Sequence, residues 1–185
     1  MARPGLDHDR VVAAAAQLAD AEGPEALTLA RVATVLGVRP PSLYNHVDGL
    51  EGLRRGIARR ALRELGAELR AAATGRSGPD ALMAVATAYR AYARAHPGGY
   101  ALVQTPDPAL AGEAREVVQT VLDALRGYDL GEDDGVHAAR AFRSAVHGFV
   151  TLEAAGGFGI PVDVEESFRR LVVVVAAGLD RRPAG

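Results

Sequence analysis

The sequence predicts an all-α fold for this chain of 185 residues. Alanine is abundant, aromatic residues make up only 5%, and β-branched runs are scarce. That composition favours helices, because alanine loses no side-chain entropy when it enters one. Between the glycine and proline breaks, apolar residues recur with the three-to-four-residue spacing of amphipathic helices.

Two helices with clear start and stop signals are expected at the N-terminal end. Asp9 can cap the first helix, which runs to about residue 22 and stops at Gly23. Thr28 is a suitable N-cap for the second helix. Gly37 ends that helix, at a place where the chain needs a left-handed residue.

A third and very short helix is expected to end near His46. Pro40 and Pro41 fit its first turn, in which a missing N–H costs little. Asp48 and Glu51 form a start resembling a capping box for a longer fourth helix. The N-terminal part therefore predicts three helices with tight connections, followed by a long one.

The remaining chain predicts further helices, each bounded by glycine or proline. They cover residues 79–95, 100–104, 108–125, 132–155 and 164–179. No internal repeat or low-complexity segment interrupts them.

The last of these segments allows two interpretations. Its β-branched run at residues 171–175 fits a strand, but the whole segment is long for a strand and no partner strand is evident. A helix that is apolar nearly all round needs cover on more than one side, and a second subunit is a natural cover in a small chain. The expected dimer interface follows the helical spacing i, i+3, i+4, i+7 and i+11, and comprises Phe168, Leu171, Val172, Val175 and Leu179.

The composition excludes several kinds of chemistry. The chain has no cysteine, so disulfides, thiolate metal sites and thiol nucleophiles are ruled out. The histidines show no helical metal-ligand pairing, and no metal or other cofactor is expected. The chain has no signal-peptide pattern, and no apolar run approaches the ~20 residues that span a bilayer. These features favour a cytoplasmic protein without membrane contact.

Positive charge is concentrated near the N-terminus, although the formal net charge is −2. Residues 31–63 contain seven arginines and two acidic residues, whereas residues 65–185 contain twelve arginines and fifteen acidic residues. A basic part joined to an acidic remainder suits one module that meets phosphates and another that does not.

Two short helices joined by a tight glycine turn are typical of a helix-turn-helix, whose second helix enters the DNA major groove. Residues 27–47 read Leu-Thr-Leu-Ala-Arg-Val-Ala-Thr-Val-Leu-Gly-Val-Arg-Pro-Pro-Ser-Leu-Tyr-Asn-His-Val. This stretch closely resembles the DNA-binding signature of the TetR family of repressors, above all in Leu-Gly-Val followed by Ser-Leu-Tyr-Asn-His-Val. The resemblance is strong over residues 9–55.

The resemblance implies a two-domain regulator. Residues 1–50 would form the helix-turn-helix domain, and residues 51–185 a helical domain that binds a ligand and forms a homodimer. Residues 143–149 read Arg-Ser-Ala-Val-His-Gly-Phe and resemble the TetR subgroup named for a Trp-His-Gly triplet, with Val146 in place of the tryptophan. Such a protein would bind a palindromic operator in double-stranded DNA and be released by a small-molecule inducer. Activation instead of repression remains an alternative.

The residues of the motif suit DNA contacts on chemical grounds. Tyr44 and His46 can donate to phosphate oxygens, and Thr28 offers a hydroxyl beside free backbone N–H groups. Asn45 can read adenine and Arg39 can read guanine through paired hydrogen bonds. The full predicted set also includes small residues at the start of the short helix and comprises Thr28, Arg39, Pro40, Pro41, Ser42, Tyr44, Asn45 and His46.

Structural interpretations compete with these roles. Tyr44 can simply pack, and His46 can cap a helix C-terminus. Many family members carry a lysine at the position of Leu50, and the resemblance leaves Arg54 or Arg55 to supply that cation. The arginines there also fit a solvated helix face.

A ligand pocket is expected in the C-terminal part, because the resemblance implies a sensor domain. Its candidate residues are Met83, Tyr89, Tyr92, His96, Tyr100, Phe142, Val146, His147 and Phe149. Aromatic and methionine residues at helical spacing also fit an ordinary core. Binding would act by population shift, since a ligand that prefers another spacing of the recognition helices would release the DNA.

Two other classes of protein are alternatives to a DNA-binding regulator. An enzyme is disfavoured because the chain lacks a nucleophile elbow, a Walker loop, a dinucleotide-binding glycine motif and a His-Glu-x-x-His motif. A helical protein-interaction module without DNA binding is the other alternative.

Overall fold

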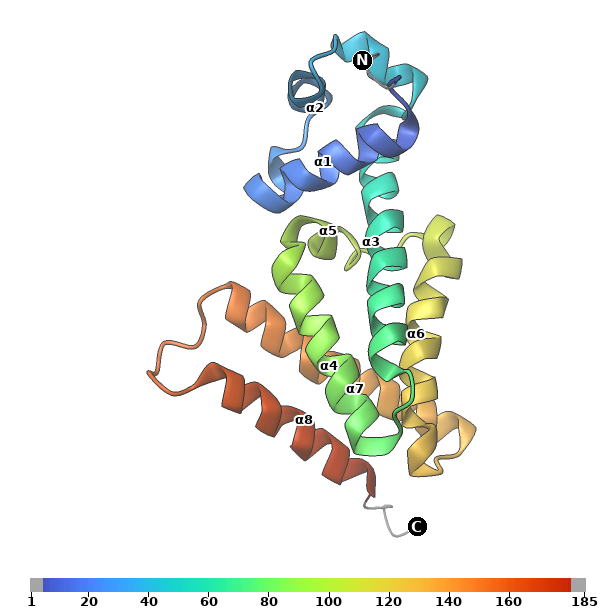
Figure 1. The fold of residues 1–185 in the computed structure, drawn as a ribbon, viewed down its shortest axis with the longest axis vertical. Helices are drawn as coiled ribbons and strands as arrows, with labels where there is room; N and C mark the ends of the chain where they lie inside the picture. The colour runs from blue at the N-terminus through green and yellow to red at the C-terminus, as the bar shows by residue number, and fades with distance from the viewer. Residues whose placement is uncertain (1–4, 181–185) are drawn as a thin grey trace. The chain divides into compact units, whose positions relative to one another are not determined.

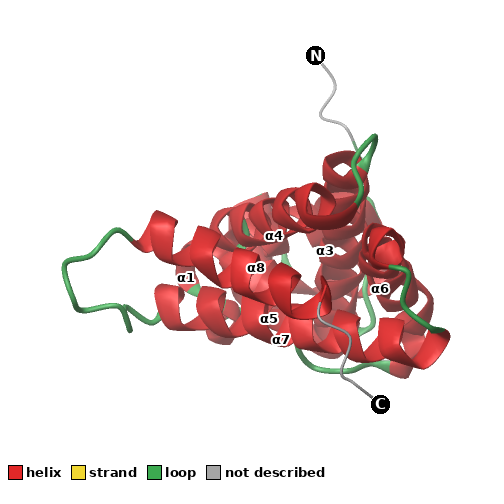
Figure 2. Cartoon of the chain, turned by 90° about the horizontal axis from the view of Figure 1, so that it is seen from below, coloured by secondary structure: helices red, strands yellow, loops and turns green. Residues whose placement is uncertain are grey.

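The computed structural model describes residues 5–180, and over that part of the chain its regular elements are helices without strands (Figure 1; Figure 2). The predicted all-α fold is therefore confirmed. The α-helices are α1 (His8–Glu22), α2 (Leu29–Leu36), α3 (Gly49–Ala73), α4 (Gly78–Ala95), α5 (Pro97–Leu102), α6 (Ala111–Leu125), α7 (Glu132–Ala154) and α8 (Val164–Asp180). Short 3₁₀ helices are η1 (Pro24–Ala26), η2 (Pro40–Asn45), η3 (Pro108–Leu110) and η4 (Arg126–Tyr128).

The helices form two compact units. The N-terminal unit contains the chain up to Glu64 together with residues 95–111, and the C-terminal unit contains residues 65–94 and the chain from Gly112 onward. Helix α3 contributes to both. These units reflect packing, and the functional division at residues 50 and 51 stays a prediction.

The first helix starts slightly earlier than expected. Asp7, not Asp9, is its N-cap, and the Asp7 carboxylate accepts a hydrogen bond from the backbone N–H of Arg10 at 2.8 Å. Asp9 lies in the first turn, where a negative charge is favourable beside the positive end of the helix dipole. The stop is as expected, since Gly23 follows the helix with φ of +87°.

The caps of α2 agree with the sequence analysis. The Thr28 hydroxyl accepts from the backbone N–H of Arg31 at 3.2 Å, which satisfies one of the N–H groups left open at the start of a helix. Gly37 is left-handed, with φ of +67°, and its N–H returns to the last turn of α2. The chain then turns directly into η2.

One apolar core holds α1, α2, η2 and the start of α3 together. Its buried members come from these four elements and the turns beside them and are Val11, Val12, Ala15, Leu18, Ala19, Leu27, Val32, Ala33, Leu43, Val47, Leu53 and Ile57. The predicted third helix is the 3₁₀ helix η2, which is anchored by Leu43 at 0% exposure. This core fixes the orientation of α2 and η2.

The C-terminal unit is a bundle of longer helices. Its most buried apolar side chains include Leu69, Leu82, Val85, Tyr92, Phe142, Val146, Phe168 and Val172. Helices α7 and α8 lie side by side, joined by a loop that the ribbon shows projecting from the bundle (Figure 1).

Helix α8 shows how the residues of the predicted dimer interface lie within one protomer, and the interface itself stays a prediction. Phe168 and Val172 are 2% and 1% exposed and belong to the core of their own protomer. Leu171, Val175 and Leu179 are half-buried. The apolar residues lie nearly all round this helix, so the sequence did not show which side faces the core.

Two valines of α2 test the packing directly. Val32 is fully buried and Val35 is 57% exposed on the same helix. Val32→Ala should lower the free energy of unfolding by about 2 kcal/mol and the melting temperature by roughly 4–8 °C, because it removes two buried methyl groups and leaves a cavity. Val35→Ala should stay within about 0.5 kcal/mol of wild type. Equal losses in calorimetry would contradict this packing.

Candidate nucleic-acid interface

The polar side chains of η2 face solvent, while its apolar residues face the core. Tyr44 is 64% exposed, and Asn45 is also exposed. Leu43 and Val47 are 0% and 5% exposed. The exposure of Tyr44 weighs against the interpretation that this ring only packs.

Three side chains in this region have their polar atoms open. Arg39, Tyr44 and Asn45 have no hydrogen-bond or ion-pair partner among the residues that the structure describes. Arg39 is the N-cap residue of η2 but makes no side-chain cap hydrogen bond. The guanidinium, phenol and amide can therefore bond an external partner without first breaking an internal bond.

The other predicted DNA-contacting residues surround this group. Pro40 and Pro41 are exposed in the first turn of η2, and Ser42 is half-buried. Thr28 is exposed, and its hydroxyl oxygen already accepts from the Arg31 N–H. The hydroxyl can still donate to an acceptor such as a phosphate oxygen.

His46 occupies a cap position, as the alternative interpretation held. It follows η2, its backbone N–H donates to the carbonyl of Leu43, and the residue is half-buried. Its own carbonyl oxygen lies 2.8 Å from Nδ1 of His8, so the start of α1 meets the end of η2. A phosphate contact by the His46 ring stays a prediction.

The arginines after η2 are tied to acidic partners. Arg54 pairs with Glu51 at 3.2 Å, and Arg55 Nε donates to Asp107 at 2.8 Å. That hydrogen bond raises the pKa of Arg55 and lowers the pKa of Asp107. Both arginines are therefore already paired, and neither is a free replacement for the lysine that many family members carry at the position of Leu50. The acidic partners were not anticipated, because Asp107 is 52 residues from Arg55 in the sequence.

The predicted ligand residues are not all in one unit. His96 and Tyr100 belong to the N-terminal unit, because the chain leaves α4 at Ala95 and starts α5 at Pro97. The remaining seven belong to the C-terminal unit. Tyr89, Tyr92, Phe142, Val146 and Phe149 are buried there, and Met83 and His147 are half-buried.

Two further observations bear on that set. Burial, with a smaller contribution from the charge of Arg143, lowers the pKa of His147, which favours a neutral ring. A cavity of about 330 Å³ in the C-terminal unit is lined by parts of α6, η4 and α7, including Leu122, Leu130 and Val136. None of the predicted ligand residues lines that cavity.

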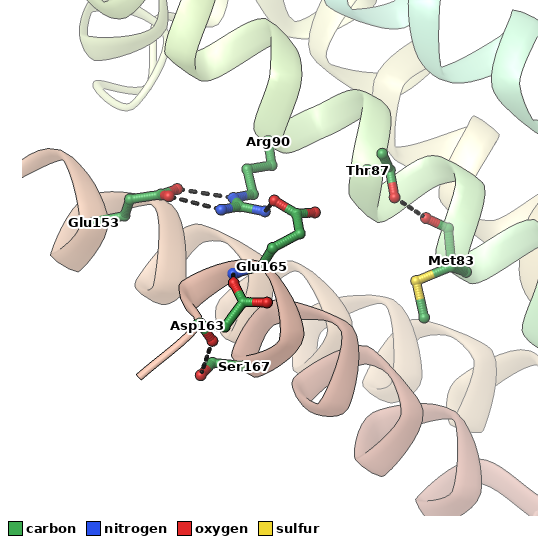
Figure 3. A network of polar contacts seen from close by, with 7 residues as sticks. All are labelled: Met83, Thr87, Arg90, Glu153, Asp163, Glu165 and Ser167. Carbon is green, nitrogen blue, oxygen red and sulfur yellow. Dashed lines mark hydrogen bonds and ion pairs between the residues drawn. The ribbon is translucent and has the colours of Figure 1, made fainter. Parts of the chain in front are cut away.

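The sequence analysis did not identify Arg90, a buried arginine in the C-terminal unit. Figure 3 shows Arg90 of α4 between two glutamates. Its Nε and Nη2 donate to the two carboxylate oxygens of Glu153 at 2.8 and 2.7 Å, and its Nη1 donates to Glu165 at 2.7 Å. The guanidinium carbon also lies 4.7 Å from the ring centre of Phe168 and 5.5 Å from that of Phe149.

This network joins α4, α7 and α8. Arg90 lowers the pKa of Glu153, and Glu153 in turn raises the pKa of Arg90. A sequence signal did exist, since Arg90 lies four residues after buried Ala86 on the apolar face of α4. A charge at such a position needs partners from other elements.

Comparisons with known proteins agree with this arrangement. Residues 82–175 match the family model described as tetracyclin repressor-like, C-terminal domain. An uncharacterised HTH-type transcriptional regulator of Mycobacterium tuberculosis, Rv0681, is 39% identical over 98% of this chain and 86% of that protein. The regulator YobS of Bacillus subtilis, of the same description, is 36% identical over 96% of this chain and 94% of that protein.

Among solved structures, a TetR variant from Acinetobacter baumannii in complex with minocycline superposes with a TM-score of 0.72. It is 24% identical, and the match covers 96% of this chain and 98% of that one. At this identity the likeness shows the fold.

A helix-turn-helix followed by a helical C-terminal unit defines a DNA-binding transcriptional regulator, which is not an enzyme. The chain belongs to the TetR family. The description of the matched family model does not name the Trp-His-Gly subgroup, so that assignment stays a prediction. Within residues 5–180, no helix is long and apolar enough to cross a membrane.

The ion pair of Arg90 predicts an acid-dependent stability. Glu153→Gln should lower the free energy of unfolding by roughly 1.5–3 kcal/mol near neutral pH, the size of a hydrogen bond to a charged group. Arg90 holds the pKa of Glu153 below its ordinary 4.5, so the stabilisation is present above about pH 4.5 and is lost as the pH falls further. The gap between wild type and E153Q in denaturant unfolding should therefore shrink on acidification.

Glu68→Gln is the control for this series. Glu68 is exposed and has no ion pair in the described part of the chain. Its loss should leave the stability nearly unchanged at every pH. A gap for E153Q that stays constant on acidification would show that the charge of Glu153 is not what stabilises the bundle.

Proposed function

We propose that this protein is a ligand-responsive repressor that binds a palindromic operator as a homodimer and is released by a small-molecule inducer. The observation that carries the proposal is the outward polar face of η2, where the side chains of Arg39, Tyr44 and Asn45 have no partner within residues 5–180. In a helix-turn-helix the second helix enters the major groove, so this face is the one that meets base edges.

The exposed residues divide into base readers and phosphate contacts. The guanidinium of Arg39 can bond the two acceptors of guanine, and the Asn45 amide can bond adenine. Tyr44 suits a phosphate, as does Thr28 at the start of α2. Pro40, Pro41, Ser42 and His46 complete the surface.

A second copy of the chain is the proposed cover for α8. Val173 and Val174 are 46% and 69% exposed on this helix, beside the half-buried Leu171, Val175 and Leu179. A stripe of this kind typically marks an interface, and twofold pairing would place two copies of η2 (Pro40–Asn45), the proposed recognition segment, on a palindrome. The revised interface therefore keeps three of the predicted residues and adds the two exposed valines.

The sensor role rests on the family. The minocycline bound to the Acinetobacter TetR variant supports a small molecule as the class of inducer. Within the C-terminal unit, Tyr89, Tyr92, Phe142, Val146, His147, Phe149 and Met83 remain the pocket candidates. We expect the protein to act in the cytoplasm, with no cofactor.

Selection of bound genomic DNA would identify the operator, and one pair of arginine variants then tests the interface. Arg39→Ala should weaken operator binding about 5–150-fold and relax the preference at one base pair, because a bidentate pair contributes roughly 1–3 kcal/mol of discrimination. Arg126→Ala removes an exposed charge from the other unit and should leave affinity nearly unchanged. Equal behaviour of the two variants in a mobility-shift titration would refute base reading by Arg39.

The dimer is tested with two valines. Val174→Asp should raise the dimer dissociation constant about 100-fold, since burying an unpaired charge costs several kcal/mol. Val118 of α6 is 41% exposed, so Val118→Asp is a matched control that should remain dimeric. Light scattering and sedimentation give the readout. A V174D protein as dimeric as wild type would exclude this face of α8.

A further inference from the structure

Helix α1 meets the start of α5 at unusually close range within the N-terminal unit (Figure 1). A β-carbon added at Gly98 would overlap the backbone carbonyl of Ala19 and lie 2.6 Å from the backbone nitrogen of Asp20. The two backbones can approach this closely only because residue 98 has no side chain. The close packing of α1 and α5 thus depends on a glycine at position 98.

A carboxylate fastens this contact. Asp20 Oδ1 accepts from the backbone N–H groups of Gly98 and Gly99 at 2.9 and 3.0 Å. Asp20 Oδ2 lies 3.1 Å from Nδ1 of His96. We call the group of Asp20, His96, Gly98 and Gly99 the Asp20 clamp.

Within the clamp, Asp20 of α1 acts as the N-cap of α5. His96 is the N-cap residue of α5 but makes no side-chain cap hydrogen bond. The open N–H groups at the start of α5 are bonded instead by Asp20, 78 residues earlier than Gly98. Bonds from N–H groups to a carboxylate are among the stronger hydrogen bonds in proteins.

The other end of α1 is tied to the recognition segment. His8 Nδ1 lies 2.8 Å from the carbonyl oxygen of His46, directly after η2. Helix α1 also shares its apolar core with Leu43 of η2. Helix α1 therefore connects η2 with α5, and α5 follows α4 after a single residue.

We propose that Asp20 is a positioning residue that holds the recognition segment in a fixed relation to α5 and so sets the half-site spacing that the dimer reads. The inference rests on the proposed function, since it needs a dimer on a palindrome. Loss of the clamp frees α1 at one end only. The apolar core of the helix-turn-helix stays intact, so each recognition segment still reads its own half-site.

The test measures spacing preference with full-length protein. Operators with fixed half-sites and inserted or deleted spacer base pairs are titrated with wild type, Asp20→Ala and Asp20→Asn. Wild type should prefer one spacing by about tenfold or more, and Asp20→Ala should reduce that preference to about threefold or less. Asp20→Asn keeps an oxygen for the two glycine N–H groups and should be intermediate.

Asp107→Ala is the matched control. Asp107 also caps a short helix of the same unit, accepting from Ala109 N at 2.8 Å, and also holds a cation, Arg55. It does not bond to α1, so its loss should leave the spacing preference unchanged even if the melting temperature falls.

The outcomes separate the two proposals. A purely structural Asp20 would lower affinity for all spacings by one factor and keep the preference, which would overturn the inference. If Asp20→Ala does not fold, an unchanged preference in Asp20→Asn overturns it equally. If wild type binds no palindrome at any spacing, the proposed function itself fails.

Discussion

The burial of Leu43 determines which side chains of η2 face solvent. In a 3₁₀ helix the side chains repeat every three residues, so an inward residue leaves its two successors to point elsewhere. With Leu43 fully buried, Tyr44 and Asn45 are directed to solvent, and the polar groups of Arg39, Tyr44 and Asn45 stay open. The proposed DNA-binding face of η2 is therefore a consequence of core packing.

Local features of the N-terminal part could be predicted because their causes are local. Thr28 and Gly37 cap α2 with atoms only a few residues away, and the alternation of Leu43 and Tyr44 follows from helical spacing. The same reasoning misplaced the first cap by two residues, because Asp7 and Asp9 offer the same capping chemistry. Only the backbone conformation decides between them.

Contacts between segments that are distant in the chain could not be predicted from the sequence pattern. Nothing in the sequence around Asp20 indicates that its partner is the start of α5. Nothing around Arg55 indicates that its partner is Asp107. The inward side of α8 was equally hidden, because a helix apolar nearly all round has no face that periodicity can select. Site residues grouped by chemical type, such as Tyr100 with Tyr89, were likewise divided between units by the break at Pro97.

The contacts of Arg90 also limit which residue can replace it in this protein. Each of its three nitrogens has its own carboxylate oxygen, and the flat face of the group lies against Phe168. A lysine would offer one nitrogen on a flexible stem and no plane to stack, so it could not serve two acids and a ring at once. At this position only a planar cation can bind both glutamates and stack on the ring.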